Sequence, residues 1–413
     1  MPDDIETRFV NHQTITMVPS LRASFNASFS NEKYQAFLED LNSRFPGAID
    51  FRISETPEFI PKWFGDKIID TCEYIIDIIT RPGFNEASER AIPSGEMVAN
   101  QNDHSHFIAF DFGICENKNG DLEPQLIEMQ GFPTLYGFEA YYPEVLRRHF
   151  SIPENYSHYF NSYTRESYIE AIREVILGNT AAEHVILLEI KPHEQKTRID
   201  FYCTQEYLGI KPVCITELIP EGMDLYYMND GRKTKIERIY NRIIFDDLHA
   251  NREKLGEIVD ITKPWNVKWI PHPNWFYRIS KFTLPFIDHP YVPETFFLNE
   301  IKQAPADLQN FVLKPLFSFA GQGVVIDVTL DDIEKVDDPR NWILQRKVKY
   351  ADVIKTPDVG AKVEIRMMYI WKDGDPRPTL ATNLSRLSKG KMIGVRYNKD
   401  KEWVGASVAF FEQ

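Results

Sequence analysis

Two carboxylates and one amide, placed on neighbouring extended segments, carry the clearest chemical signal in this sequence. In LIEMQG, Glu128 and Gln130 share one face of an extended chain, because side chains alternate along a strand. Asp111 lies in the preceding extended segment, HFIAFDFGIC, and Asn119-Gly120 between the two segments is a strong hairpin-turn signal. A two-residue turn at this point predicts that Asp111 lies directly opposite Glu128, on the same face of the hairpin.

That pairing predicts a metal site. Two carboxylates that face each other across a strand ladder repel, and a divalent cation would compensate for the repulsion. A set of two carboxylates and one amide oxygen suits Mg2+, which also retains water and substrate phosphates as ligands. The alternative is an exposed acidic hairpin whose charges are screened by water. Phe110, Phe112 and Ile127 flank the acids and favour the metal site, because apolar neighbours keep water away from the charges.

A single lysine stands before a glycine-containing loop in FVLKPLFSFAGQGVVIDV, residues 311–328. The pattern predicts a β-hairpin in which Lys314 lies at the end of the first strand and Gly321 and Gly323 lie in the loop. Small residues let backbone N–H groups approach phosphate oxygens, and lysine supplies a mobile positive charge. The alternative is an ordinary glycine hairpin whose edge lysine discourages aggregation.

Several familiar motifs are absent from the sequence: GxxxxGK[ST], GxSxG and HExxH do not occur. Asp103-His104-Ser105-His106 contains two histidines two residues apart, but no further ligands support a metal there. We interpret this stretch as a polar surface loop.

Composition limits the class of protein. The chain has 413 residues, enough for two or three domains, and its 43% hydrophobic and 26% charged residues are typical of a soluble globular protein. The net charge of −14 argues against a nucleic-acid partner and suits a cationic or amine substrate. No apolar run is long enough for a membrane helix, and the acidic start MPDDIETRFV is unlike a signal peptide. The four cysteines lack CxxC spacing and are expected to be buried free thiols, which favours the cytoplasm.

The elements that must position these residues alternate between helices and strands. NEKYQAFLEDLNSRF and KIIDTCEYIIDIIT predict helices in the first hundred residues. HFIAFDFGIC and QLIEMQG predict a pair of strands, with Leu126, Glu128 and Gln130 on one face of the second. HVILLEIKP, TRIDFYCTQEYLG and IKPVCITEL read as a βαβ unit, and the polar residues 246–265 are a plausible boundary.

The C-terminal third continues this mixed pattern. RISKFTLPFI predicts a helix, and the lysine hairpin follows it. NWILQRKV, EIRMMYIW and GASVAFFE predict three further strands. The predicted fold class is therefore mixed α/β (α+β) with a large antiparallel component.

Together these segments resemble the ATP-grasp family, in the circularly permuted branch that includes glutathionylspermidine synthase. FDFGIC followed by LIEMQGFPTLYGFEA resembles the acidic strand pair of that branch and the stretch after it, with Pro133, Thr134 and Glu139 aligned. The acidic set precedes the lysines, which is the permuted order. The resemblance runs from about residue 100 to the C-terminus.

The resemblance implies a site for ATP and Mg2+. Lys281 in RISKFTLPFI would be the first ATP lysine and Lys314 the second. WILQRKV would be the hinge that receives adenine, starting at Gln345. The remaining implied contacts are the loop residues Gly321, Gln322 and Gly323, the hinge residues Arg346, Lys347 and Val348, and the metal ligands Asp111, Glu128 and Gln130.

The sequence also departs from that branch. Gln130 stands where the branch usually has Asn, and Ala109 stands where glutathionylspermidine synthase has an Arg two residues before the Asp. Phe319-Ala320 replaces an Arg-Glu pair in the loop. The resemblance therefore supports the ATP site, but not a specificity for glutathione or spermidine.

The expected activity is an ATP-dependent ligase that joins a carboxylate to an amine through an acylphosphate. Arg366, Arg386 and Arg242 are candidates to hold the carboxylate or the acylphosphate, because guanidinium groups bind such anions bidentately. Each could equally form a surface ion pair. The alternatives for the whole protein are a phosphotransferase and a nucleotide-binding protein without turnover.

The expected organisation has four parts. They are a helical N-terminal region (1–100), an acidic, Mg-binding part of a permuted ATP-grasp core (101–160), an α/β subdomain (161–260) and a nucleotide-binding part (261–413). The expected partners are a small-molecule or peptide carboxylate and an amine acceptor, without nucleic acid or membrane. A homodimer is left open.

Overall fold

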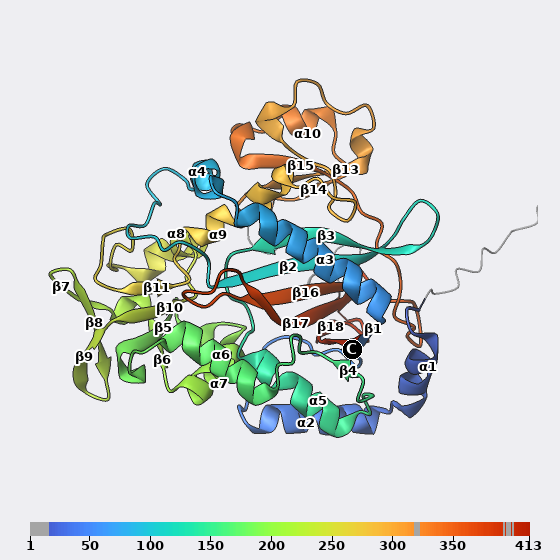
Figure 1. The fold of residues 1–413 in the computed structure, drawn as a ribbon, viewed down its shortest axis with the longest axis horizontal. Coiled ribbons are helices and arrows are strands. Elements are labelled where there is room, and N and C mark those ends of the chain that lie inside the picture. The colour runs from blue at the N-terminus through green and yellow to red at the C-terminus, as the bar shows by residue number, and fades with distance from the viewer. Residues whose placement is uncertain (1–15, 318–322, 391–392, 394–397, 399) are drawn as a thin grey trace, which may run out of the picture.

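This computed structural model describes residues 16–317, 323–390, 393, 398 and 400–413. A five-stranded antiparallel sheet lies in the middle of the molecule (Figure 1). A small antiparallel sheet with helix α10 lies above it in this view, and a parallel sheet lies to its left. The mixed α/β class predicted from the sequence is confirmed. In this part of the chain, no helix combines the length and the apolar character needed to cross a bilayer.

The central sheet joins the predicted acidic hairpin to strands from the C-terminal end of the chain. Its strand order is β18-β17-β16-β2-β3. The strands are β2 (Phe107–Glu116), β3 (Leu122–Gln130), β16 (Lys362–Ile370), β17 (Thr379–Ser388) and β18 (Gly405–Ser407). Since β2 pairs with both β3 and β16, residues more than two hundred positions apart in the sequence share one sheet.

The register of the acidic hairpin is the predicted one at Asp111, which lies opposite Glu128. The predicted two-residue turn is wrong, because Glu116 pairs with Leu122 and residues 117–121 form the loop. A β-bulge at Ile127 offsets this difference by adding one residue to β3. The bulge also corrects the predicted face of Leu126, which pairs with Phe112 on the apolar face while Glu128 lies on the other.

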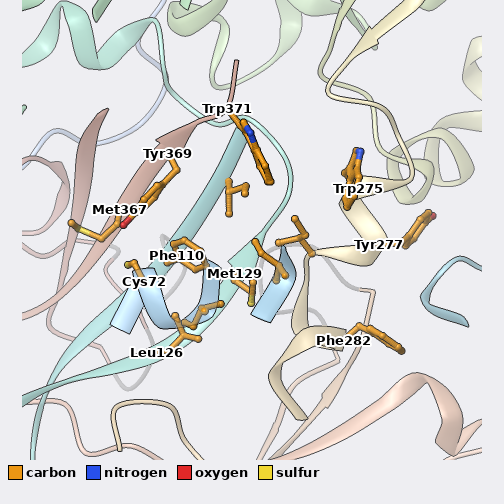
Figure 2. Close-up of a cluster of buried hydrophobic side chains, with 14 of the residues drawn as sticks. Cys72, Phe110, Leu126, Met129, Trp275, Tyr277, Phe282, Met367, Tyr369 and Trp371 are labelled. Carbon is orange, nitrogen blue, oxygen red and sulfur yellow. The ribbon is translucent and has the colours of Figure 1, made fainter. Parts of the chain in front are cut away.

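Helix α3 (Lys62–Ile79) covers the apolar face of the central sheet. Its buried stripe includes Cys72, which lies beside Phe110 and Leu126 in the largest hydrophobic cluster (Figure 2). This packing explains the bulge, because Leu126 and Met129 both reach the core only if one extra residue separates them. The opposite face of the sheet is left for charged side chains.

The other N-terminal helices pack beside the central sheet rather than on the site. The predicted helix at NEKYQAFLEDLNSRF is α2, and its expected stripe buries Tyr34, Phe37 and Leu41. In a short sheet with the order β1-β19-β4, a strand of the N-terminal region pairs with the last strand of the chain. The elements here are α1 (Pro19–Ser28), α2 (Asn31–Ser43), α4 (Phe84–Ser88), α5 (Tyr142–His149), β1 (Glu58–Ile60), β4 (Tyr156–Ser157) and β19 (Ala409–Glu412).

The predicted βαβ unit is confirmed as part of a parallel sheet with the order β11-β10-β5-β6. The chain passes from β5 to β6 on one side and then to β10 on the other side of β5. The strand order therefore reverses between β5 and β10. The elements are β5 (Val185–Glu189), β6 (Lys211–Cys214), β10 (Arg238–Asn241), β11 (Lys268–Ile270), α6 (Arg165–Leu177), α7 (Arg198–Leu208) and α8 (Phe245–Leu255).

A meander of three strands extends from this sheet, with the order β7-β8-β9. Its strands are β7 (Ile219–Glu221), β8 (Asp224–Asn229) and β9 (Arg232–Ile236). Helix α8 occupies the first half of the polar stretch 246–265, the plausible boundary between segments in the sequence.

The small antiparallel sheet contains the predicted lysine hairpin. Its order is β12-β15-β13-β14, and β13 and β14 pair as expected. Residues 318–322 of the loop, with Gly321 and Gln322, lie outside the described residues. The elements are α9 (Trp275–Arg278), β12 (Thr295–Phe297), β13 (Phe311–Pro315), β14 (Val325–Ile326), α10 (Leu330–Glu334) and β15 (Trp342–Arg346).

Four other expectations need correction or confirmation. RISKFTLPFI forms a 3-10 helix, Lys281–Phe286, rather than a longer α-helix. GASVAFFE forms two strands of different sheets, β18 and β19. His106 is fully buried, with Nε2 3.2 Å from Asp373 Oδ1, so DHSH is only partly a surface loop. The four cysteines are buried and free, as predicted.

Candidate functional site

The two predicted ATP lysines are both influenced by the charge of the same carboxylate, Glu128. Lys314 stands on β13 with Nζ donating to Gln345 Oε1 at 2.5 Å and reaching the carbonyl of Ile127 at 3.5 Å. That carbonyl belongs to the extra residue of the β3 bulge. The bulge therefore places a backbone acceptor of the central sheet against a lysine of the small sheet.

Burial dominates the electrostatics of Lys314. It lowers the pKa of the ammonium to about 8, Glu128 and Glu364 raise it, and the positive charge of Lys281 lowers it. Burial likewise lowers the pKa of Lys281, while Glu128 and Asp246 raise it. Glu128 therefore acts on the charge of both lysines, beside the contact of Lys314 with Ile127 that joins the small sheet to the central sheet.

Asp111 is held by two arginines. Arg366, directly opposite on β16, donates from Nε and one terminal nitrogen to the two carboxylate oxygens at 2.5 Å each. Arg386 on β17 donates to Asp111 Oδ2 at 2.6 Å. Burial opposes ionisation of Asp111, but the two guanidinium groups outweigh it and hold its pKa below the usual value.

This arrangement corrects the electrostatic argument from the sequence. The repulsion between Asp111 and Glu128 is real, but Arg366 lies between them, 3.4 Å from Glu128 Oε1. The positive charges of the arginines thus compensate for the paired carboxylates without a metal ion. An ionised carboxylate offers about four lone-pair sites, and the two arginines occupy three of those on Asp111.

Glu364 extends the same charged row. It precedes Arg366 by two residues on β16 and pairs across the ladder with Arg386, which donates to Glu364 Oε2 at 2.9 Å. The hydroxyl of Tyr350 donates to the other oxygen, Oε1. We call the row Asp111, Glu128, Glu364, Arg366 and Arg386 the charged face of the central sheet. Burial raises the pKa of Glu364, and Arg386 opposes that rise.

The predicted metal ligands share this charged face. Glu128 is half-exposed, with 40% of its side chain accessible, and Gln130 lies opposite Ala109 on the same side. Gln130 donates from Nε2 to the carbonyl of Phe132 at 3.1 Å, and this bond fixes the plane of the amide and with it the direction of the side-chain oxygen. The described residues contain no cluster of three histidine, cysteine, aspartate or glutamate side chains arranged for a metal. A bound ion would therefore combine Glu128 and Gln130 with ligands from water or phosphate.

Arg242 lies apart from the other two candidate arginines. It follows β10 at the carboxyl edge of the parallel sheet, where it donates to Thr134 O at 2.6 Å and lies 3.5 Å from Asp200 Oδ2. Ligands of open parallel sheets bind at such a reversal of strand order. The loop after β3 brings this edge to the acidic hairpin, since Thr134 follows Gln130 by four residues.

Buried acids surround Arg242. Burial raises the pKa of Glu189 to about 8, although its bond from Ile190 N–H and the charge of Arg242 oppose the shift. Burial also raises the pKa of Asp200 to about 6, against Arg242 and the N–H groups of Phe138 and Gly137. The positive charge of Arg242 is thus fixed within a carboxyl-rich environment.

The hinge residues lie at the end of β15. Gln345 is buried and links Lys314 to Thr295 Oγ1, to which its Nε2 donates at 3.2 Å. The backbone N–H of Arg346 donates to Glu294 O, and that of Lys347 donates to Asn310 O. Val348 is half-buried beyond them. Reading of an adenine edge by these residues stays a prediction, and the amides of Arg346 and Lys347 already have protein acceptors.

The loop glycines are only partly described. Gly323 has a φ of +73°, a left-handed conformation that favours glycine. An added Cβ there would lie 3.1 Å from the ring of Pro315. The conformation of Gly323 therefore agrees with a tight turn where the predicted loop leads into β14.

Sequence reasoning missed Glu364 and Tyr350. The signal for Glu364 was present: in EIRMMYIW, Glu364 and Arg366 alternate with apolar residues and must share one strand face. Tyr350 carried no such signal, because it lies outside any regular strand and its contact with Glu364 depends on how residues 349–351 pair with β2. Glu189 and Asp200, which surround Arg242, were missed because their burial depends on the packing of the parallel sheet.

Comparison with known proteins agrees with this fold. No family model matches the sequence, and no curated protein matches it. Among solved structures, the chain is similar to a glutathione synthetase-like effector from Globodera pallida in its apo form, with a TM-score of 0.59 and 11% identity. The match covers 94% of this chain and 99% of that one. At this identity the likeness shows a shared fold and no more.

Proposed function

We propose that the protein is an ATP-dependent ligase that joins a carboxylate to an amine through an acylphosphate, with Mg2+ as cofactor. The observation that carries the proposal is the contact of Lys314 with the carbonyl of Ile127, next to Glu128, where the small sheet meets the central sheet. Glu128 acts electrostatically on both Lys314 and the buried Lys281. Preorganised cations in water-poor surroundings stabilise the charge that develops on a transferred phosphoryl group. The fold would be an ATP-grasp fold in circularly permuted order, since the acidic strands precede both lysines in the chain.

Glu128 and Gln130 would hold Mg2+, with one remaining lone-pair site on Asp111 directed from the opposite strand. Their carboxylate and amide oxygens fit a hard ion that keeps several water or phosphate ligands. When bound, the ion would neutralise part of the negative charge of the phosphate groups. The adenine would lie against the end of β15, near residues 346–348.

The arginines of the charged face would hold the acid substrate. Arg366 and Arg386 meet at Asp111, and a substrate carboxylate beside them would face the γ-phosphate near Lys314. A carboxylate oxygen would attack the γ-phosphorus, the bond to the bridging oxygen would break, and ADP would leave. The amine would then attack the acyl carbon, inorganic phosphate would leave, and the nitrogen would lose a proton.

The second substrate, the amine, would bind at the carboxyl edge of the parallel sheet, where the strand order reverses between β5 and β10. Arg242 and Glu189 mark its carboxyl edge, and Asp246 acts electrostatically on Lys281 from the start of α8. The carboxylates of Asp246 and Glu189 would attract the ammonium group of the second substrate, while Arg242 would bind an anionic group of the same molecule.

ADP release measures this function directly. The protein is screened with Mg-ATP against pairs of carboxylates and amines, each also tested alone. We expect ADP to form only when an acid and an amine are present together. ADP formed with a single acceptor would make the protein a phosphotransferase, and ATP binding without ADP under any condition would make it a binding protein.

A further inference from the structure

We infer that Tyr350 and Glu364 are positioning residues, which hold Arg386 against Asp111 and connect the hinge segment to the arginine pair. The inference rests on the proposed function, in which the arginine pair binds the anionic substrate. Nothing in the reaction chemistry requires these two residues. The argument comes from their contacts.

The segment after the hinge continues the central sheet. Strand β16 pairs with residues 107–113 of β2, and residues 349–351 lie along the same edge of β2 next to residues 114–116. Glu116 N donates to Lys349 O at 2.8 Å, and Ala351 N donates to Ile114 O at 2.9 Å. Tyr350 forms an antiparallel bridge with Cys115. The side chain of Tyr350 therefore lies on the charged face, because Cys115 is two pairs of residues along β2 from Asp111.

Gly113 makes room for the ring of Tyr350. A Cβ added to Gly113 would lie 2.6 Å from Cε1 of Tyr350, closer than real contacts allow. The ring therefore lies against β2 at Gly113, two residues from Asp111 on the same face. From this place its hydroxyl donates to Glu364 Oε1.

Glu364 links the hydroxyl of Tyr350 to the arginines. Its second oxygen accepts from Arg386 at 2.9 Å, and the same nitrogen of Arg386 reaches Asp111 Oδ2 at 2.6 Å. Asp111 also holds Arg366, so one continuous row of hydrogen bonds runs from Tyr350 to both arginines. Tyr350 follows the end of β15 by only four residues. The place where adenine is proposed to bind is thus tied to the place where the substrate anion is proposed to bind.

The test compares the wild-type protein with Tyr350→Phe, which keeps the ring against Gly113 and removes only the hydroxyl. Tyr74→Phe is the matched control, because its hydroxyl donates to a surface carbonyl, that of Asp288. Calorimetric titration measures the affinity for Mg-ADP, then the affinity of the Mg-ADP complex for inorganic phosphate. Thermal melts report the fold.

We expect Tyr350→Phe to bind inorganic phosphate about tenfold more weakly, with Mg-ADP affinity within about twofold of wild type, because the lost bond ends on a charged network. Tyr74→Phe should match the wild type in both titrations. Equal phosphate affinity in wild type and Tyr350→Phe, or no phosphate binding to wild type with Mg-ADP bound, would overturn the inference alone. Failure of the wild type to bind Mg-ADP would overturn the proposed function and the inference with it.

Discussion

Asp111 and Glu128 lie directly opposite each other on β2 and β3, yet their carboxylates have different surroundings. The side chain of Asp111 is 2% exposed and accepts bonds from two arginines, whereas that of Glu128 is 40% exposed and lies 3.4 Å from one of them. Asp111 therefore neutralises the buried guanidinium group of Arg366 and the half-exposed one of Arg386, and Glu128 retains oxygens for a ligand. The two acids are expected to respond differently to loss of charge.

Glu128→Gln should leave the apo protein almost unchanged, with a free energy of unfolding within about 1 kcal/mol of wild type, because half-exposed ion pairs contribute little. Mg-dependent ATP turnover should be lost. Chemical denaturation and ADP release measure the two effects. Glu123→Gln, on the same strand and bonded to Gln125, is the control and should keep turnover. A Glu128→Gln variant with normal turnover would exclude this residue from the metal site.

Asp111→Asn should lower the free energy of unfolding by about 3–5 kcal/mol, because breaking the buried ion pair leaves Arg366 with only the more distant, half-exposed Glu128 as a counter-charge. Arg366 and Arg386 would then face each other without the carboxylate that separates their charges. Urea denaturation at neutral pH measures the change. A loss as small as that of Glu128→Gln would mean that the arginines turn to solvent in solution.

Lys314→Met should weaken Mg-ATP binding by at least about tenfold, since a charged hydrogen bond to phosphate is lost. The apo protein should be as stable as wild type or more stable at pH 7, because burial already lowers the pKa of Lys314 to about 8 and disfavours its charge. Lys335→Met, at the residue that follows α10 and is paired with Asp331 on the surface, is the control. Unchanged affinity with a destabilised apo protein would instead support the ordinary glycine hairpin.

His106 should make the protein sensitive to acid. Burial lowers its pKa from 6.5 to about 4, although Asp373 opposes the shift and the nearby His104 and Lys268 add to it. The unfolded chain binds this proton at a higher pH than the folded one, so stability falls as pH decreases from about 6.5 to 4. The wild type should lose up to about 3 kcal/mol relative to His106→Gln across this window. Denaturation of both proteins at pH 7 and pH 4.5 measures the difference, and parallel losses would contradict it.

Local patterns predicted much of the fold. The acidic hairpin, the βαβ unit, the lysine hairpin and the helices α2 and α3 follow from periods of two and 3.6 residues and from turn chemistry. The position of Asp111 opposite Glu128 was also predicted, but for an incomplete reason. A longer loop at 117–121 and a bulge at Ile127 shift the register in opposite directions. Leu126 and Met129, three residues apart and both buried, are the trace of that bulge in the sequence.

The remainder depended on contacts between distant segments. Strand β17 was not predicted from TNLSRLSKGK, because its polar residues Thr382, Asn383 and Ser385 are all buried and do not alternate with core residues. The side chains of Thr382 and Asn383 bond to the carbonyl of His158, outside this sheet. The partners of Asp111 were not predictable from its own segment, since both arginines come from strands more than two hundred residues later.

The most direct test of the central claim is a structure of the protein with Mg2+ and a non-hydrolysable ATP analogue. We predict phosphate oxygens within hydrogen-bond distance of Lys314 and Lys281, the metal on Glu128, and adenine against the end of β15. A nucleotide bound elsewhere, for example against β5 and β6 of the parallel sheet, would contradict this account.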